Sequence, residues 1–213
     1  MKLHWSPRSP FVRKVMIAAR ELGLADRLDL VRTVAITTQP SPTLMADNPL
    51  NKIPTLVLDD GVALFDSRVI CEYLDGLGGR PALFPSAGAE RWRALRRQAL
   101  GDGLMDLLVV WRGERARSPE LRSAPHLAAY HAKGIAALDL LEAEAGPPPE
   151  GPIDIGDISV GCALAYLDFR FADLAWPRGR PRLDAWRRAF DARPSALASR
   201  IVDDEDQPIT PAP

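Results

Sequence analysis

The stretch Asn48-Pro49-Leu50-Asn51-Lys52-Ile53-Pro54-Thr55-Leu56-Val57-Leu58 decides the fold of this chain. It reads as a polar turn, a proline and an apolar run that is typical of a buried strand. A proline donates no hydrogen bond within a sheet, so Pro54 must stand where the strand begins or where pairing is broken. A cis Ile53–Pro54 bond would turn the chain sharply and leave the main chain of Ile53 ready to pair with an extended peptide. The stretch alone favours a trans bond, since only about 5–6% of X–Pro bonds are cis.

The residues around this stretch predict a small mixed sheet covered by helices, within residues 1–77. Ser9-Pro10 supplies the favoured first residues of a helix that Gly23 closes. Asp59-Asp60-Gly61 is typical of a hairpin turn, and Asp66-Ser67 begins another helix. The expected strands are residues 3–5, 28–34, 55–58 and 62–65, and a short helix is expected within 41–47.

The second half of the chain changes to an all-helical pattern after a linker rich in glycine and proline at residues 78–88. Apolar residues then recur at helical spacing, and no convincing strand follows. Helices are expected at residues 89–117, 118–145 and 154–173, and from 182 and 194. We therefore predict an α/β domain at 1–77, an all-α domain at 89–202 and a loose tail at 203–213.

Asp154 and Asp157 fit a capping box at the start of the expected helix 154–173. In this motif the side chain of the first residue accepts a hydrogen bond from an N–H group in the first turn of the helix. The side chain of the second residue reaches back to the N–H group of the first. The alternative is a carboxylate pair for catalysis or metal binding. Helix initiation is the favoured interpretation.

Composition excludes several classes of protein. The chain has 213 residues, 46% hydrophobic and 26% charged, with a net charge of −1 that gives no electrostatic footprint for nucleic acid. We expect no contact with membrane, because no apolar run is long enough to span one. The N-terminus lacks the apolar segment of a secretory signal. Cys71 and Cys162 form no C-x-x-C pair, so we expect buried reduced thiols, no metal site and a cytoplasmic protein.

Four motifs in the right order make nearly the whole chain resemble the glutathione transferases. They are Ser6-Pro7-Arg8-Ser9-Pro10 at the first strand–helix junction, Ile53-Pro54, Phe65-Asp66-Ser67, and Asp154-x-x-Asp157. The resemblance implies a thioredoxin-like βαβαββα N-terminal domain of the α/β class, followed by an all-α helical bundle. It also implies that Pro54 is cis. The chain is most similar to bacterial members that carry serine rather than tyrosine or cysteine.

The resemblance implies that glutathione is the cosubstrate and that Ile53, with Pro54, offers its main chain to the cysteinyl part. Asp66 and Ser67 match the pair that holds the γ-glutamyl end, where a helix N-terminus suits a carboxylate. Asp66 also fits a plain helix cap, and the two roles can coexist. Lys52 fits either a glycyl-carboxylate contact or a solvated loop lysine. A second, weaker candidate for the glycyl contact is Gln39.

Ser9 is the predicted catalytic residue. A free thiol has a pKa of about 8.5, so only about 3% is thiolate at pH 7. A hydroxyl donor and the positive end of a helix both stabilise a thiolate. The alternatives are that Ser9 only caps its helix, or that Ser6 is the acting hydroxyl. Disulfide reduction is disfavoured, because no cysteine stands at this junction.

The pocket for the second substrate is expected between the two domains, where ligand sites are common. The candidates are Trp5, Phe11, Met105, Trp111, Arg112 and Tyr166. Core packing is the alternative for each aromatic residue. Asp102 and Asp106 share one helix face and either line this cleft or form a solvated face.

The first predicted function is conjugation of the glutathione thiolate to a small hydrophobic electrophile, in detoxification, by a homodimer. One alternative is another glutathione-dependent reaction, such as peroxide reduction, dehalogenation, ether cleavage or isomerisation. Another is a non-catalytic binding module of the same fold. The intact glutathione set argues against the module. It does not separate the reactions, because that choice depends on the apolar pocket.

Overall fold

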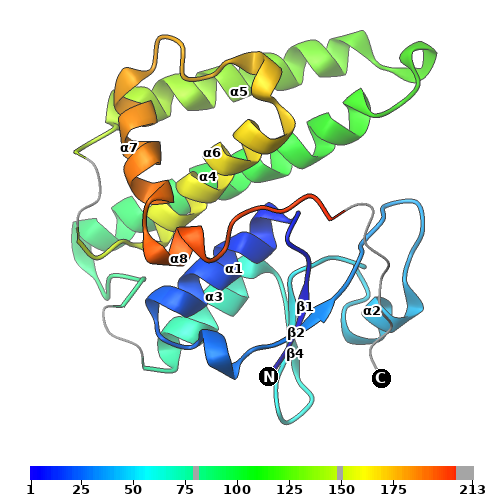
Figure 1. Ribbon diagram of the computed structural model, residues 1–213, viewed down its shortest axis with the longest axis vertical. Helices are drawn as coiled ribbons and strands as arrows, with labels where there is room; N and C mark the ends of the chain where they lie inside the picture. The colour runs from blue at the N-terminus through cyan, green and yellow to red at the C-terminus, as the bar shows by residue number, and fades with distance from the viewer. Residues whose placement is uncertain (79–81, 148–150, 205–213) are drawn as a thin grey trace. The chain divides into compact units, whose positions relative to one another are not determined.

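The computed structural model describes residues 1–78, 82–147 and 151–204, and these form two compact units. The first unit comprises residues 1–86 together with the C-terminal segment from Ser195, and the second comprises Ala87–Pro194. Figure 1 traces the chain through both. Residues 195–202 were expected in the helical domain, but they belong to the first unit.

The first unit is built on a four-stranded mixed sheet with the strand order β2-β1-β3-β4. The central strand β1 (Lys2–Trp5) pairs in parallel with β2 (Asp29–Arg32) and antiparallel with β3 (Thr55–Val57). The edge strand β4 (Ala63–Leu64) pairs antiparallel with β3. Leu3 and Leu56 stand opposite each other and are both fully buried, so the core of this unit lies under β1 and β3.

Three helices accompany the sheet: α1 (Pro10–Glu21), α2 (Pro42–Asp47) and α3 (Ser67–Gly76). A short 3-10 turn, η1 (Ala25–Arg27), precedes β2. In Figure 1, α1 and α3 lie side by side next to the sheet, and α2 lies on the other side of the strands. The thioredoxin-like βαβαββα order is therefore confirmed.

The second unit is entirely helical within its described residues. Its elements are α4 (Gly88–Arg115), η2 (Pro119–Leu121), α5 (Ala124–Glu144), α6 (Ile155–Arg170), η3 (Ala172–Leu174) and α7 (Pro181–Asp191), and α8 (Pro194–Leu197) follows at the boundary. The helix expected at 118–145 is divided, because each of two prolines begins its own helical segment. The helix expected at 154–173 ends at Arg170.

The capping box at the start of α6 is confirmed. The Asp157 N–H donates to Asp154 Oδ1 at 3.0 Å, and the Asp154 N–H donates to Asp157 Oδ2 at 3.2 Å. Burial, followed by the nearby Asp154 carboxylate, raises the pKa of Asp157, although Arg97 lies 3.1 Å away and opposes the shift. Both carboxylates therefore serve the helix terminus.

The described residues contain neither a membrane-spanning helix nor a cluster of metal-binding side chains. No helix in residues 1–78, 82–147 and 151–204 is long and apolar enough to cross a membrane. Over the same ranges, no group of three or more His, Cys, Asp and Glu side chains could hold a metal ion. Both cysteines are buried. Parts of two predicted segments lie outside the described residues: 79–81 of the linker and 205–213 of the tail.

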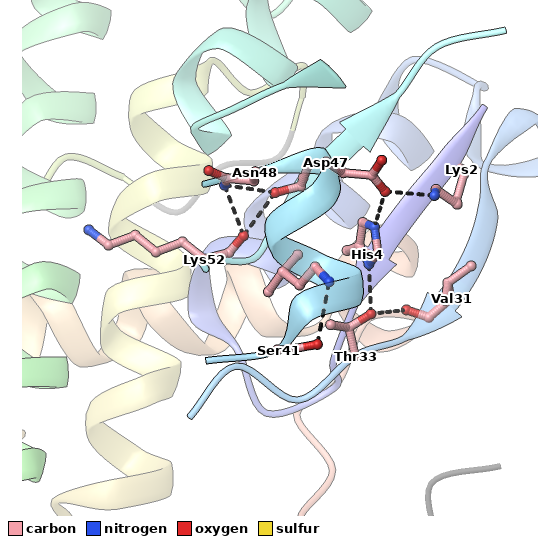
Figure 2. A network of polar contacts seen from close by, with 10 residues as sticks. Lys2, His4, Val31, Thr33, Ser41, Asp47, Asn48 and Lys52 are labelled. Atoms are coloured by element: carbon pink, nitrogen blue, oxygen red, sulfur yellow. Dashed lines mark hydrogen bonds and ion pairs between the residues drawn. The ribbon is translucent and has the colours of Figure 1, made fainter. Parts of the chain in front are cut away.

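A polar network ties β1 to α2 and to the end of β2 (Figure 2). His4, only 2% exposed, contacts Asp47 Oδ2 through Nε2 at 2.7 Å and Thr33 Oγ1 through Nδ1 at 2.9 Å. Lys2 Nζ donates to the same Asp47 oxygen at 2.6 Å. His4 therefore has a structural role, because its two ring nitrogens join β1 to α2 and to the end of β2.

Replacing Asp47 by asparagine is expected to destabilise the first unit at neutral pH. The hydrogen bonds from His4 and then Lys2 lower the pKa of Asp47, so its charged form is favoured in the folded state. The stabilisation of the folded state by this carboxylate is therefore fully present above the pKa of about 4 that Asp47 has in the unfolded chain. It is lost as the pH falls through the lower pKa that Asp47 has in the folded state. We expect D47N to cost about 1–3 kcal/mol at pH 7 and less below pH 4.

Urea denaturation of the wild type and D47N at pH 7 and pH 3 measures this difference. The matched control is D59N, because Asp59 pairs with the N-terminal ammonium but is 85% exposed, and exposed pairs contribute little. A cost for D47N that is equal at both pH values contradicts the prediction.

Candidate functional site

Three chain segments of the first unit reach the same end of the sheet. The end of β1 leads to Ser9. Since β3 is antiparallel to β1, Ile53-Pro54, which precedes β3, lies at that same end. Since β4 is in turn antiparallel to β3, Asp66-Ser67, which follows β4, lies there as well. Neighbouring strands lie about 4.8 Å apart, so the three segments span roughly 10 Å. That is about the length of an extended tripeptide.

Ser9 stands at the N-cap of α1. Its Oγ accepts a hydrogen bond from the Val12 N–H at 3.3 Å, as the capping alternative predicts. This bond uses a lone pair and leaves the hydroxyl proton for a second partner. The N–H groups of the first turn of α1 and its positive end lie beside this hydroxyl. Ser9 can therefore cap the helix and also donate to an anion.

Ser6, the competing hydroxyl, has a different environment. It is 6% exposed, and its Oγ accepts from the Arg8 N–H at 3.4 Å. It lines a groove that includes Leu30 and Arg32 of β2, so it faces the β2 side of β1. Ile53 and Asp66 belong to the β3 and β4 side. This placement favours Ser9 over Ser6.

The Ile53–Pro54 peptide bond is cis, as the resemblance implies. Pro54 is buried and Ile53 is half-buried. The Ile53 main chain precedes β3 and makes no hydrogen bond to the residues that the structure describes. Its N–H and C=O therefore provide a pairing edge for an extended peptide. A second cis bond, Phe65–Asp66, stands at the third segment.

Two buried polar residues hold the turn before Ile53 (Figure 2). Asn48, 1% exposed, donates from Nδ2 to the Lys52 carbonyl at 3.1 Å and to Thr55 Oγ1 at 2.9 Å. Thr55, fully buried, donates to the same carbonyl at 2.8 Å. Sequence reasoning did not assign these positioning roles. The available signal was the pair of polar residues flanking the turn at Asn48 and at the start of β3.

Asp66 and Ser67 begin α3. Asp66 is exposed, and its Oδ1 accepts from the Arg68 N–H at 2.8 Å, so the capping role is confirmed. Ser67, the first residue of the helix, is 2% exposed. The first N–H groups of a helix have no partner within it, so this terminus can bind a carboxylate while Asp66 keeps its cap.

The two candidates for the glycyl end are less well placed. Lys52 is exposed, and Figure 2 shows its side chain extending away from the network that holds its carbonyl. Gln39 is exposed and pairs through its main chain with Ile36. Both side chains are thus compatible with a ligand contact and with a solvated position.

The pocket candidates divide between the two units. Phe11 is half-buried in the first turn of α1. In α4, Met105 is fully buried and Trp111 packs against Phe171 with ring centroids 4.8 Å apart, which favours the packing interpretation for both. Arg112 is exposed. The pocket expected between the domains stays a prediction.

Three further candidates are mostly buried. Trp5 is half-buried at the end of β1, and Tyr166 is 3% exposed in α6. Asp102 is 1% exposed whereas Asp106 is exposed. The solvated-face interpretation is therefore wrong for Asp102.

Comparisons with known proteins give one consistent result. The model of the glutathione S-transferase N-terminal domain matches residues 8–77, and that of the glutathione S-transferase C-terminal domain matches residues 124–189. A glutathione transferase family member from Pseudomonas fluorescens Pf-5, crystallised with bound glutathione, is 45% identical with a TM-score of 0.90. That match covers 93% of this chain and 98% of that chain.

Curated relatives are more distant. The GST-like protein YibF of Escherichia coli K12 is 33% identical over 185 residues, which are 86% of this chain and 90% of that protein. A maleylacetoacetate isomerase of Pseudomonas aeruginosa is 29% identical over the full length of both chains. The relatives thus share an architecture but differ in what they are named to do.

Proposed function

Because the chain belongs to the glutathione transferase family, we propose that it binds glutathione and joins its sulfur to a small hydrophobic electrophile. The observation that carries the proposal is the convergence of Ser9, Ile53 and Asp66-Ser67 at one end of the sheet. The bound glutathione in the Pseudomonas fluorescens relative supports the same cosubstrate here.

The three segments provide complementary contacts for an extended tripeptide. The main chain of Ile53 pairs with the cysteinyl residue. The γ-glutamyl carboxylate lies at the N-terminus of α3, where Ser67 donates, and Asp66 meets the ammonium. This arrangement directs the cysteinyl side chain toward the start of α1, where Ser9 stands.

Ser9 activates the thiol by stabilising its anion. Its O–H donates to the sulfur, and the N-terminus of α1 adds a favourable positive potential. The thiolate electron pair then forms a bond to the electrophilic carbon, and the leaving group departs with its electrons. Lowering the thiol pKa by about two units requires roughly 2.7 kcal/mol of selective anion stabilisation.

A glutathione-dependent isomerisation is the second candidate. The full-length match to a maleylacetoacetate isomerase favours it over the remaining alternatives. In that chemistry the thiolate adds to a double bond and is later expelled, so the same activation by Ser9 applies. Peroxide reduction, dehalogenation, ether cleavage and a non-catalytic module remain alternatives, and a homodimer and a cytoplasmic location remain predictions.

The proposal is tested by calorimetric titration with glutathione, followed by a conjugation assay with 1-chloro-2,4-dinitrobenzene. We expect D66N to bind glutathione about tenfold more weakly, a change of about 1.4 kcal/mol, because it loses the charge that meets the ammonium. D60N is the matched control, since Asp60 also accepts from the N–H two residues ahead, at 3.0 Å. A wild type that binds no glutathione refutes the proposal and the isomerase alternative together.

A further inference from the structure

Asn51 lies two residues before Ile53 and has a left-handed backbone, with a φ of 52°. Asparagine adopts this region more readily than other residues that carry a side chain. The Asn51 N–H donates to the Asn48 carbonyl at 3.0 Å, which closes the turn before the cis-proline. Glycine takes the same backbone conformation without strain, so N51G removes the side chain and keeps the turn.

The side chain of Asn51 holds both ends of the loop 36–41, which follows β2. Its Oδ1 accepts from the Ser41 N–H at 2.9 Å, and its Nδ2 donates to the Ile36 carbonyl at 3.4 Å. Between these two points the Gln39 N–H donates to the same Ile36 carbonyl at 3.2 Å. One amide group therefore fixes the loop that carries Gln39 to the turn that carries Lys52.

Little else fixes this loop. Residues 36–40 are all exposed, and even the apolar Ile36 is 42% exposed, so the loop is not held by burial. Apart from the bond of Asn51 to Ile36, no hydrogen bond joins residues 36–40 to another segment of the chain that the structure describes. The position of Gln39 relative to Ile53 therefore depends on Asn51.

Strand topology brings the loop to the same end of the sheet as the three segments of the candidate site. Because β2 is parallel to β1, the end of β2 lies beside the end of β1, which leads to Ser9. The proposed γ-glutamyl contact is on the β4 side, and the cysteinyl contact is at Ile53, before β3. The glycyl residue of an extended tripeptide then continues away from β4, toward the side of β1 and β2.

We propose that Asn51 is a positioning residue that determines how strongly the site distinguishes glutathione from γ-glutamylcysteine, the same peptide without its glycine. The inference rests on the proposed binding of glutathione. Asn51 joins the two segments whose side chains, Gln39 and Lys52, can donate to the glycyl carboxylate. With both segments already ordered, the ligand does not have to order them when it binds, and this pre-organisation strengthens binding. Asn51 itself acts through the loop and the turn.

The test is a calorimetric titration of the full chain with glutathione and, separately, with γ-glutamylcysteine. We expect N51G to bind glutathione about tenfold more weakly, because the loop must then be ordered on binding. Its affinity for γ-glutamylcysteine should equal that of the wild type, since Ile53, Asp66 and Ser67 are unchanged. In turnover, N51G should raise KM for glutathione and leave kcat unchanged.

A175G is the matched control. Ala175 is also a non-glycine residue with a positive φ, of 44°, and it lies in the second unit. A175G should bind both peptides like the wild type. Hydrogen exchange of the ligand-free chain checks the loop directly: the Ser41 N–H should exchange faster in N51G than in the wild type or A175G.

A double-mutant cycle tests whether Asn51 acts through Gln39. We expect Q39A to bind glutathione about fivefold more weakly and γ-glutamylcysteine like the wild type, because a contact to the glycyl carboxylate is lost. If the two residues act together, N51G/Q39A should bind glutathione about tenfold more weakly than the wild type, and not the roughly 50-fold that independent effects would give.

Three results would overturn the inference: an equal loss of affinity for both peptides in N51G, unchanged exchange at Ser41, or additive effects in the double variant. A wild type that binds both peptides with N51G giving any of these results keeps the proposed function and loses only the role of Asn51. A wild type that binds neither peptide refutes the proposed function, and the inference with it.

Discussion

Replacing Ser9 by alanine is expected to lower kcat/KM for conjugation about 25-fold at pH 7. Without the Ser9 hydroxyl, the pKa of bound glutathione should rise by about two units, which takes its thiolate fraction at pH 7 from about 75% to about 3%. The loss must depend on pH, because the thiol ionises without help above its free pKa. The two enzymes should therefore converge above about pH 9.

The pH profile of kcat/KM for the wild type and S9A measures this shift. Ultraviolet difference spectra of bound glutathione report the thiolate directly. If kcat/KM of S9A is lower than that of the wild type by the same factor at every pH, or equals it at every pH, Ser9 does not activate the thiol.

Capping must be separated from catalysis, because S9A also loses a helix cap, worth about 1 kcal/mol of stability. Ser41 is a matched control: it N-caps α2, precedes a proline and accepts from the Leu44 N–H at the same 3.3 Å. S41A should lose a cap and keep the pH profile. S9T retains a hydroxyl and should keep most of the activity, and S6A should resemble the wild type.

Replacing Gly101 by alanine is expected to lower the free energy of unfolding by about 3 kcal/mol, because overpacking of this kind is strongly destabilising. Helices α4 and α6 approach so closely that a Cβ at Gly101 would lie 2.6 Å from the Ser159 carbonyl carbon and 2.7 Å from the Val160 nitrogen. Backbone atoms cannot rotate aside as a side-chain tip can. The whole helix pair must therefore separate.

Gly103 provides a control on the same helix. A Cβ at this position meets nothing within 4 Å. G103A should be neutral or more stable by about 0.5–1 kcal/mol, because alanine favours a helix over glycine. Urea denaturation of G101A and G103A compares the two, and equal stabilities would contradict the close approach of α4 and α6.

Local signals in the sequence predicted most of the fold. Ser9-Pro10, Asp66 and the Asp154–Asp157 pair mark helix starts, and the structure confirms each cap. These interactions join residues at most three positions apart, so the sequence contains both partners. β1 begins one residue earlier than predicted, whereas β2, β3 and β4 are shorter than predicted, because ladder pairing rather than apolar character sets the ends of a strand.

Signals in the candidate site were only partly local. The residues expected to hold glutathione were recognisable as motifs, and strand topology brings them to one end of the sheet. The supporting roles of Asn48 and Thr55 were not recognisable, because a polar residue in a turn gives no sign that it will be buried. The burial of Asp102 in α4 was not recognisable either, because an aspartate in a helix is usually expected on the solvated face.

The sequence by itself determined the class of this protein, the order of its elements and the position of Pro54 before β3, because these depend on neighbouring residues. Only the tertiary structure placed the C-terminal segment on α1 and β2. Arg13 meets Ser199 across 186 positions and Arg32 meets Asp204 across 172. Such pairings depend on how complete elements pack, and no local pattern encodes them. The groove that these residues line together with Ser6 is therefore a property of the folded chain alone.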